Sequence, residues 1–245
     1  MLRRAIALPG RVRRRAVRTV RRWTPGGRIA EQEVQPPVPW PNTRKRNSEV
    51  WGQEYDWSQK GEEWTPSPEW KQSLIDDVLL RWIGRDGTVL EIGSGAGRWT
   101  ESLQPIARRL VLVDITEKSM ELCKKRFADC SNIEYFVNDG KSLGFLPKES
   151  IDYVWSWDAF VHINKEDTAA YMKEFARVLK PGACAVIHHP SGLDTAGGWR
   201  SDVTTASFAD LVRRNGLILI EQFDSWGDGK FDVRHHRDTI SVFRK

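Results

Sequence analysis

The five histidines of this 245-residue chain are the side chains best suited to proton transfer near neutral pH. An unperturbed imidazole has a pKa of about 6.5, so it can take a proton from a weakly acidic group and release it again. His162 comes four residues after Asp158, His188 and His189 end an apolar run, and a second adjacent pair occupies positions 235 and 236. These histidines are therefore the candidate general bases.

A metal centre is not expected from the same residues. Successive side chains on a strand point to opposite faces, so His188 and His189 cannot easily bind one ion together. Cys123, Cys130 and Cys184 also lack the spacing of metal ligands. They are typical of a reducing compartment, where such thiols are small core residues or inert.

The glycine-rich run Val-Leu-Glu-Ile-Gly-Ser-Gly-Ala-Gly at residues 89–97 predicts a strand, a tight turn and the start of a helix. Glycines there let a ligand approach bare backbone amides. A dinucleotide fingerprint needs G-x-G-x-x-G, but position 98 is Arg. Glu91 before the glycines would repel a pyrophosphate and would suit a ligand that carries an ammonium or sulfonium charge.

Three further acids follow predicted strands. Asp114 ends an apolar run 23 residues after Glu91, and Asp139 and Asp158 follow the third and fourth runs. A carboxylate at Asp114 can accept hydrogen bonds from both hydroxyls of a ribose. Any one of these acids could be a helix cap, but four in register after four strands are harder to explain in that way.

Together these motifs resemble class I S-adenosylmethionine-dependent methyltransferases, from about residue 70 to the C-terminus. The resemblance implies that Asp114 holds the ribose of S-adenosylmethionine and that Asp139 contacts the adenine amino group. The cofactor site that it implies comprises Trp64, Glu91, Gly93, Ser94, Gly95, Gly97, Asp114, Ile115, Asp139, Gly140, Trp157 and Asp158.

Methyl transfer to an aliphatic hydroxyl requires a general base or a metal, because such an alcohol is barely ionised at neutral pH. The family places the segment after the fourth strand beside the sulfonium, so we expect His162 to be the catalytic base. His188 and His189 are the alternatives, because loops after the fifth strand also line a doubly wound active site. The pair at 235 and 236 is a further candidate.

The apolar pattern predicts an α/β fold with a doubly wound, seven-stranded, mostly parallel sheet. Apolar runs alternate with amphipathic helices, which implies parallel strands and right-handed crossovers. The last two strands are separated only by a loop, so we expect them to pair antiparallel, which distinguishes this fold from a dehydrogenase. Strands are predicted near 88–92, 110–114, 133–137, 151–157, 183–188, 217–220 and 239–243, and helices near 98–107, 117–129, 166–179 and 204–215.

The segment from Trp51 to Trp64 is too aromatic for a linker, because aromatic side chains at this density are normally buried. It precedes a helix predicted to begin near Pro68. In the family that the chain resembles, segments just before this helix often close over the cofactor. We therefore interpret Tyr55, Trp57 and Trp64 as a lid, with a purely structural packing clamp as the alternative.

Charge is distributed unevenly. Residues 1–28 hold ten arginines and no acid, whereas the rest of the chain has 28 basic and 33 acidic side chains. We predict a basic arm at 1–28, a proline-rich irregular linker at 29–48, and a methyltransferase domain at 49–245 with its lid at 49–68. Apolar residues of the arm recur at helical spacing, at Val12, Ala16, Val17, Val20 and Trp23.

Three interpretations of the arm stay open: an amphipathic contact with an anionic membrane or polyphosphate, a disordered solubilising segment, and an organellar presequence. No apolar run approaches the roughly 18 residues that span a bilayer. We expect a cytoplasmic protein, with peripheral contact at the inner membrane surface as the candidate role of the arm.

The acceptor is predicted to be a small hydroxylated molecule. Trp199 could stack on a sugar ring while Asp194 and Arg200 bind its hydroxyls; the alternative is an ordinary loop with a packed tryptophan. The segments Tyr-Asp-Trp-Ser, Gly-Glu-Glu-Trp, Phe-Val-His-Ile, Gly-Trp-Arg-Ser and Asp-Thr-Ile-Ser-Val-Phe resemble small bacterial methyltransferases that modify sugars in polysaccharide and glycolipid assembly. A saccharide or lipid-linked saccharide is therefore the preferred acceptor.

Other functions compete with this one. An N-methyltransferase of a small molecule would need no strong base if the amine arrives neutral. An RNA-directed methyltransferase could use the arginine arm on phosphates, but the rest of the chain is acidic and residues 156–159 lack a base-flipping motif of the Asn/Asp-Pro-Pro-Tyr/Phe type. Retention of Glu91, Asp114 and Asp139 argues against an inactive scaffold.

Overall fold

The computed structural model describes residues 20–22, 30–32, 42–192, 200–234 and 237–245. The chain divides into two units, Met1–Val38 and Pro39–Lys245. In the first unit, β1 (Val20–Arg22) pairs antiparallel with β2 (Ala30–Gln32). The apolar spacing of the arm predicts a helix, but Val20–Arg22 form a strand whose backbone pairs with β2. Residues 1–19 and 23–28 of the arm lie outside the described residues.

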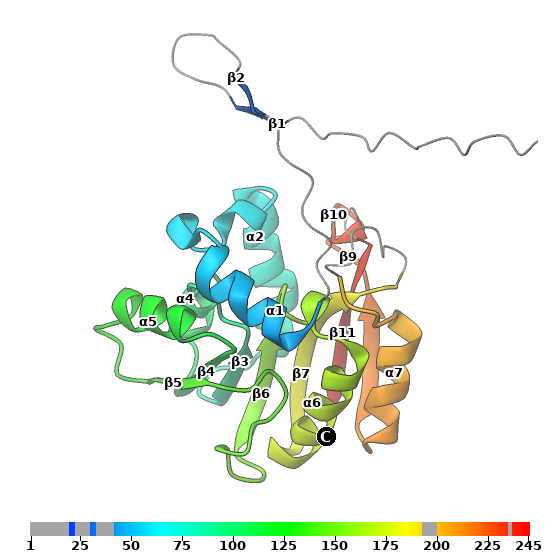
Figure 1. The fold of residues 1–245 in the computed structure, drawn as a ribbon. Coiled ribbons are helices and arrows are strands. Elements are labelled where there is room, and N and C mark those ends of the chain that lie inside the picture. Colours follow the sequence, from blue (N-terminus) through cyan, green and yellow to red (C-terminus); the bar gives the residue numbers. More distant parts are fainter. Residues whose placement is uncertain (1–19, 23–29, 33–41, 193–199, 235–236) are drawn as a thin grey trace, which may run out of the picture. The chain divides into compact units, whose positions relative to one another are not determined.

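The second unit contains a seven-stranded sheet with the order β5-β4-β3-β6-β7-β11-β8 (Figure 1). The strands from β3 to β7 pair in parallel, and β11 lies antiparallel between β7 and β8. This confirms the predicted mostly parallel sheet with an antiparallel last strand. The strands are β3 (Thr88–Ile92), β4 (Arg109–Asp114), β5 (Ile133–Val137), β6 (Ile151–Ser156), β7 (Leu179–Pro190), β8 (Ile218–Phe223) and β11 (Asp238–Arg244), with a separate pair β9 (Ser225–Trp226) and β10 (Phe231–Asp232).

Helices connect these strands at nearly the predicted positions. The exception is α4, which is much shorter than the predicted helix at 98–107, because turns take the place of its first and last residues. The helices are α1 (Arg44–Glu49), α2 (Pro68–Leu74), α3 (Leu80–Trp82), α4 (Thr100–Leu103), α5 (Glu117–Arg126), α6 (Lys165–Val178) and α7 (Thr205–Arg214), with single turns at Val50–Glu54, Trp57–Gln59, Glu62–Trp64, Ile75–Leu79 and Phe160–His162.

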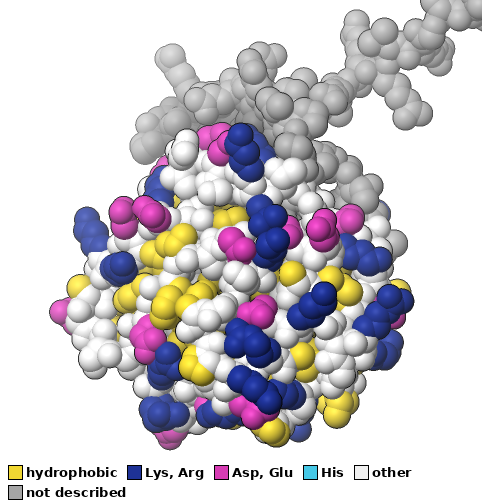
Figure 2. All heavy atoms as spheres, turned by 60° about the horizontal axis from the view of Figure 1, so that its bottom comes forward, with side chains coloured by type: hydrophobic (Ala, Val, Ile, Leu, Met, Phe, Trp, Pro, Cys, Tyr) yellow, Lys and Arg dark blue, Asp and Glu magenta, His cyan; other side chains and the backbone are white. Residues whose placement is uncertain are grey.

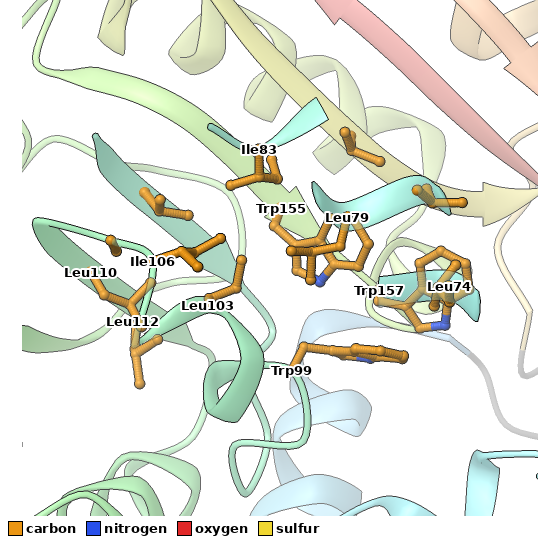
Figure 3. Packing of buried hydrophobic residues seen from close by; sticks show 14 of the residues in the cluster. Leu74, Leu79, Ile83, Trp99, Leu103, Ile106, Leu110, Leu112, Trp155 and Trp157 are labelled. Carbon is orange, nitrogen blue, oxygen red and sulfur yellow. The ribbon is translucent and has the colours of Figure 1, made fainter. Parts of the chain in front are cut away.

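The core consists of two apolar clusters on opposite faces of the sheet. One cluster packs α6 and α7 against the sheet, and the other packs the region from α2 to α5 against it. In the second cluster Trp99, Trp155 and Trp157 lie against Leu74 and Leu79 of the leading helical segment (Figure 3). Trp155 and Trp157 stack with their centroids 5.6 Å apart, which makes the end of β6 rigid where the chain turns toward Asp158.

Helix α1 begins inside the stretch at 29–48 that was predicted to be irregular. Thr43 caps this helix by accepting a hydrogen bond from the backbone of Arg46. Two buried amides then attach it to the body: Asn42 donates to Asn164 (2.9 Å), and Asn47 donates to the carbonyl oxygen of His162 (2.9 Å). Residues 44–48 are therefore folded, because these contacts with a distant part of the chain hold them.

The surface of the body carries charges of both signs. On the face shown in Figure 2, lysines and arginines alternate with aspartates and glutamates, with apolar side chains between them. Among the residues that the structure describes, no helix is both long enough and apolar enough to cross a membrane.

Candidate active site

A cavity opens at the carboxyl ends of the parallel strands β3, β4, β5 and β6, where doubly wound folds bind their ligands. Each of these strands contributes the residues that directly follow it, and the segment between Asn42 and Trp64 completes the wall. Of the residues predicted to bind a cofactor, the cavity is lined by Trp64, Gly93, Ser94, Gly95, Asp114, Ile115, Gly140, Trp157 and Asp158.

The glycine loop after β3 depends on backbone shapes that favour glycine. Gly95 has a φ of +54°, and a Cβ atom there would lie 2.7 Å from the ring of Trp57. Gly97 does not line the cavity: a Cβ atom there would lie 2.6 Å from Phe127, so this glycine permits the loop to pack against the end of α5. Residues 93–95 of the loop thus line the cavity, whereas Gly97 packs against the core.

Asp114 lies in the cavity wall with only 8% of its surface exposed. One carboxylate oxygen accepts a hydrogen bond from Gly95 N (3.0 Å), and the other accepts from Thr116 N (3.0 Å) and Thr116 Oγ1 (3.1 Å). Burial raises the pKa of Asp114, and these hydrogen bonds oppose that shift. The carboxylate has further lone pairs, so it can still accept a hydrogen bond from a ligand.

Glu91 does not line the cavity, contrary to the expectation that its charge meets the ligand. The side chain is buried within the sheet, where it accepts a hydrogen bond from Thr100 Oγ1 (2.7 Å). Burial raises the pKa of Glu91 to about 8. The carboxyl group is therefore mostly protonated at neutral pH. Its hydrogen bond with Thr100 joins the end of β3 to the first residue of α4.

Asp139 also lies outside the cavity lining, unlike its neighbours Asn138 and Gly140. Its Oδ1 accepts hydrogen bonds from Lys141 N (3.1 Å) and from Ser142 N and Oγ (both 2.8 Å), so it shapes the turn after β5. The neighbouring cation is Arg44, which the sequence did not indicate. Arg44 donates to the carbonyl oxygen of Asp139 (3.2 Å), and its Nε lies 3.3 Å from Asp167.

Asp158 is the acid that faces the cavity, with 35% of its side chain exposed. It has a φ of +59°, which is uncommon for a residue other than glycine. Its carboxylate pairs with Arg98, and its other oxygen lies 3.1 Å from His188 Nδ1. Burial alone would raise the pKa of Asp158, but Arg98 and His188 hold it well below its usual range. The group is therefore ionised.

Of the three candidate bases that the structure describes, His162, His188 and His189, only His162 lines the cavity. Its ring lies against Trp51 with the centroids 5.2 Å apart. His188 is buried under Asp158 and stacks on Trp157 (4.4 Å between centroids), and its Nε2 lies 3.2 Å from Asp238 Oδ2. Burial lowers the pKa of His188, which Asp158 partly opposes.

His189 points to the other face of β7. Its Nε2 lies 2.7 Å from Ser241 Oγ and its Nδ1 lies 2.8 Å from the carbonyl oxygen of Pro190, while its ring stacks on Phe208. Burial lowers the pKa of His189 to about 3, so the imidazole is neutral near physiological pH. These contacts join β7, β11 and α7, and they indicate a structural role for His189.

The aromatic segment lies at the cavity. Trp51, Trp57 and Trp64 all line it, and Trp57 Nε1 donates to the carbonyl oxygen of Trp51 (2.8 Å). Trp64 is 48% exposed, and its Nε1 donates to the hydroxyl of Tyr55 (2.6 Å). With Trp99 and Trp157, the cavity wall therefore contains five tryptophans.

Two predicted acceptor contacts, Asp194 and Trp199, and the candidate bases at 235 and 236 lie outside the described residues. Arg200 is described; it is buried and pairs with Asp238. Among the described parts of the chain, no group of three or more histidines, cysteines and acids is arranged to hold a metal ion.

Parts of the chain are similar to known methyltransferases. A family model described as a methyltransferase domain matches residues 89–182. A probable S-adenosylmethionine-dependent methyltransferase of Mycolicibacterium smegmatis is 27% identical over 164 residues, which are 66% of this chain and 57% of that protein. Demethylmenaquinone methyltransferase of Staphylococcus saprophyticus is 34% identical over 120 residues, covering 48% of this chain and 49% of that protein.

Solved structures show the same fold. The crystal structure of an S-adenosylmethionine-dependent methyltransferase from Aquifex aeolicus matches with a TM-score of 0.56 at 16% identity, covering 78% of this chain and 98% of that one. The chain spans about half the length of the curated relatives described above.

Proposed function

We propose that the chain is a class I S-adenosylmethionine-dependent methyltransferase and that it methylates a hydroxyl group of a small acceptor, a saccharide or lipid-linked saccharide. One observation carries this proposal: a single cavity joins the glycine loop and Asp114 to Asp158 and His162. A cofactor site and a candidate base thus share one wall.

The residues around the cavity fit the family's cofactor. Asp114 lies in the wall with acceptor capacity to spare, and Gly93 and Gly95 bring backbone within reach of a ligand. We propose that these residues hold S-adenosylmethionine together with Ser94, Ile115, Gly140, Trp157, Asp158 and Trp64. When bound, the cofactor supplies an activated methyl group, and the protein must orient the acceptor, exclude water and remove a proton.

The acceptor side of the cavity combines an aromatic ring with amides and an acid. Trp51 lines the cavity, and so do the polar side chains of Asn42, Asn164 and Asp167. These side chains support a ring-shaped, hydroxylated acceptor, which can stack on an indole and hydrogen-bond through its edge. The relatives include proteins named for quinone substrates, so an aromatic acceptor is the competing candidate for the same tryptophan-rich wall.

His162 is proposed as the base. It lines the cavity, whereas His188 and His189 do not. An imidazole beside the acceptor can take the hydroxyl proton as the new O–C bond forms. Trp51 against one side of the ring limits how the imidazole can turn.

The test is a survey of acceptors with the full-length protein. Release of S-adenosylhomocysteine is measured with sugars, sugar–lipid conjugates, quinols and amines at equal concentration. Turnover of the saccharides and none of the amines supports the proposal. Turnover confined to quinols or amines would reject the saccharide assignment while leaving methyl transfer intact, and failure to bind S-adenosylmethionine would reject the function itself.

The regional organisation is also a proposal: a basic arm at 1–28, a linker that continues to about residue 41, and a catalytic domain from there to residue 245. The hydrogen bonds of Asn42 and Asn47 to the segment after β6 support the earlier start of the domain. The arm is proposed to contact anionic membrane lipids through its ten arginines, which attract such lipids at low ionic strength.

A further inference from the structure

We propose that Arg98 and Asp158 form a paired clamp for the α-amino and α-carboxylate groups at the amino-acid end of the cofactor, an inference that rests on the proposed function. Arg98 would bind the carboxylate and Asp158 the ammonium group. From the sequence alone, we expected Glu91 to be the acid that meets the positive charge of the ligand.

Arg98 is a buried cation with donor capacity left over. Only 8% of its side chain is exposed, yet it lines the cavity. Its Nη2 pairs with Asp158, whereas its Nη1 has no hydrogen-bond partner among the described residues. A buried donor without a partner is unfavourable, so an arrangement of this kind indicates a group that arrives with the ligand. The guanidinium also lies over Trp99, 5.1 Å from the ring centroid, which limits its movement.

Asp158 contacts His188 and also lines the cavity. Its backbone N–H donates to His188 Nδ1 (3.2 Å), and Oδ1 lies 3.1 Å from the same nitrogen. His188 Nε2 in turn lies 3.2 Å from Asp238 Oδ2, and Asp238 pairs with Arg200, so Asp158 stands at one end of a row of charged or titratable side chains of which the other three are buried. About a third of the Asp158 side chain still faces the cavity, and its carboxylate can accept further hydrogen bonds.

The two groups together match an α-amino acid. In such a ligand the ammonium and carboxylate groups share one carbon atom, so adjacent charges of opposite sign on the protein can meet both at once. A guanidinium binds a carboxylate through charge-assisted hydrogen bonds, which are stronger than neutral ones. Glu91 cannot take this role, because its carboxyl group lies outside the cavity and burial raises its pKa to about 8.

Two other cations line the cavity but fit less well. Arg44 is occupied by Asp167 and the carbonyl oxygen of Asp139. Lys60 is exposed to solvent, where a charge is well hydrated and gains little from a ligand. Lys60 therefore provides a matched control: a cation in the same wall that the clamp does not require.

The experiment compares two ligands by isothermal titration of the full chain. S-adenosylhomocysteine carries the amino-acid end, whereas 5′-methylthioadenosine keeps the adenosine and the sulfur but lacks that end. The wild-type protein should bind S-adenosylhomocysteine more tightly. In Arg98→Met and in Asp158→Asn, affinity for S-adenosylhomocysteine should fall roughly 10- to 100-fold, as expected for lost charged hydrogen bonds, while affinity for 5′-methylthioadenosine changes less than about threefold.

The ratio of the two affinities separates the clamp from general damage. Lys60→Met should keep the wild-type ratio. Arg98→Lys retains the charge beside Asp158 and covers the case in which Arg98→Met does not fold; it should still weaken S-adenosylhomocysteine selectively. Equal losses for both ligands, or equal wild-type affinities, would overturn the clamp and leave the proposed function standing. A wild-type protein that binds neither ligand would overturn both.

Discussion

Replacing Gly95 by alanine tests whether the glycine loop is built around Trp57. Gly95 has a φ of +54°, and a Cβ atom there would lie 2.7 Å from two carbons of the Trp57 ring. Trp57 cannot simply turn aside, because its Nε1 donates to the carbonyl oxygen of Trp51 at 2.8 Å. The substitution therefore imposes a backbone cost and a steric cost at the same residue.

The two costs can be given magnitudes. Left-handed backbone costs a residue with a Cβ atom about 1–2 kcal/mol relative to glycine. Forcing an extra methyl group into a packed site costs about 1–3 kcal/mol more. Gly95→Ala should therefore lower the free energy of unfolding by about 2–5 kcal/mol, a large share of the roughly 5–15 kcal/mol that keeps a domain folded.

Two other glycines separate these contributions. Gly216 has a φ of +71°, and no atom lies within 4 Å of the place that a Cβ atom would take, so Gly216→Ala should cost about 1–2 kcal/mol from the backbone alone. Gly144 also has open space around its Cβ position and does not have positive φ. Gly144→Ala should change stability by no more than about 0.5 kcal/mol.

Urea unfolding, followed by tryptophan fluorescence, gives the three free energies under one set of conditions. The expected order of destabilisation is Gly95→Ala, then Gly216→Ala, then Gly144→Ala. A loss at Gly95 no larger than that at Gly216 would refute the steric argument, because it would mean that Trp57 moves at no cost. The segment that carries Trp57 would then be loosely attached to the glycine loop.

Four further outcomes are expected. Asp114→Ala should weaken S-adenosylmethionine binding in isothermal titration, because its carboxylate lines the cavity and holds Gly95 N; equal affinity would contradict its role. His162→Ala should lower kcat roughly 10²–10⁴-fold with cofactor affinity nearly unchanged, and a near-normal kcat would exclude it as the base. Deleting residues 1–28 should leave turnover of a soluble acceptor unchanged but weaken binding to anionic vesicles at low salt, with the difference shrinking as salt rises; lost turnover would place the arm in the active site. The pKa of Glu91 is raised from 4.5 to about 8, so the folded state holds the proton more tightly than the unfolded state and loses stability as pH rises between these two values. Glu91→Gln should reduce this loss of unfolding free energy, measured in urea at several pH values. If the variant shows the same dependence of unfolding free energy on pH as the wild type, Glu91 is not a buried protonated carboxyl group.

The sheet and its order of elements were predictable because the signals are local. Apolar runs that alternate with amphipathic stripes indicate strands and helices, and the segment between the last two strands of the sheet, β8 and β11, has no helical pattern that would indicate a crossover. The glycine loop and Asp114 were identified in the same way, since both directly follow a strand. Such features depend on neighbouring residues, so the sequence contains the information.

The roles of individual acids were less predictable. Glu91 and Asp139 occupy the expected positions, but one carboxyl group is buried beneath the loop and the other shapes a turn. The position of a residue at the end of a strand predicts where its backbone lies. It does not predict the direction of its side chain, which depends on the hydrogen-bond partners nearby. Glu91 accepts its hydrogen bond from Thr100, and Asp139 accepts one from Ser142, and these contacts set the direction of the two side chains.

Local pattern and chain connectivity were enough to predict the topology of the sheet and the edge of the sheet at which the cavity opens. Which charges meet at that edge depended instead on the three-dimensional packing of the chain. Arg98, Asp158, His188 and Asp238 come from four separate segments, up to 140 residues apart. Their pairing depends on how parallel and antiparallel strands are placed side by side, and the energy of a buried charge depends on partners that no local pattern reveals.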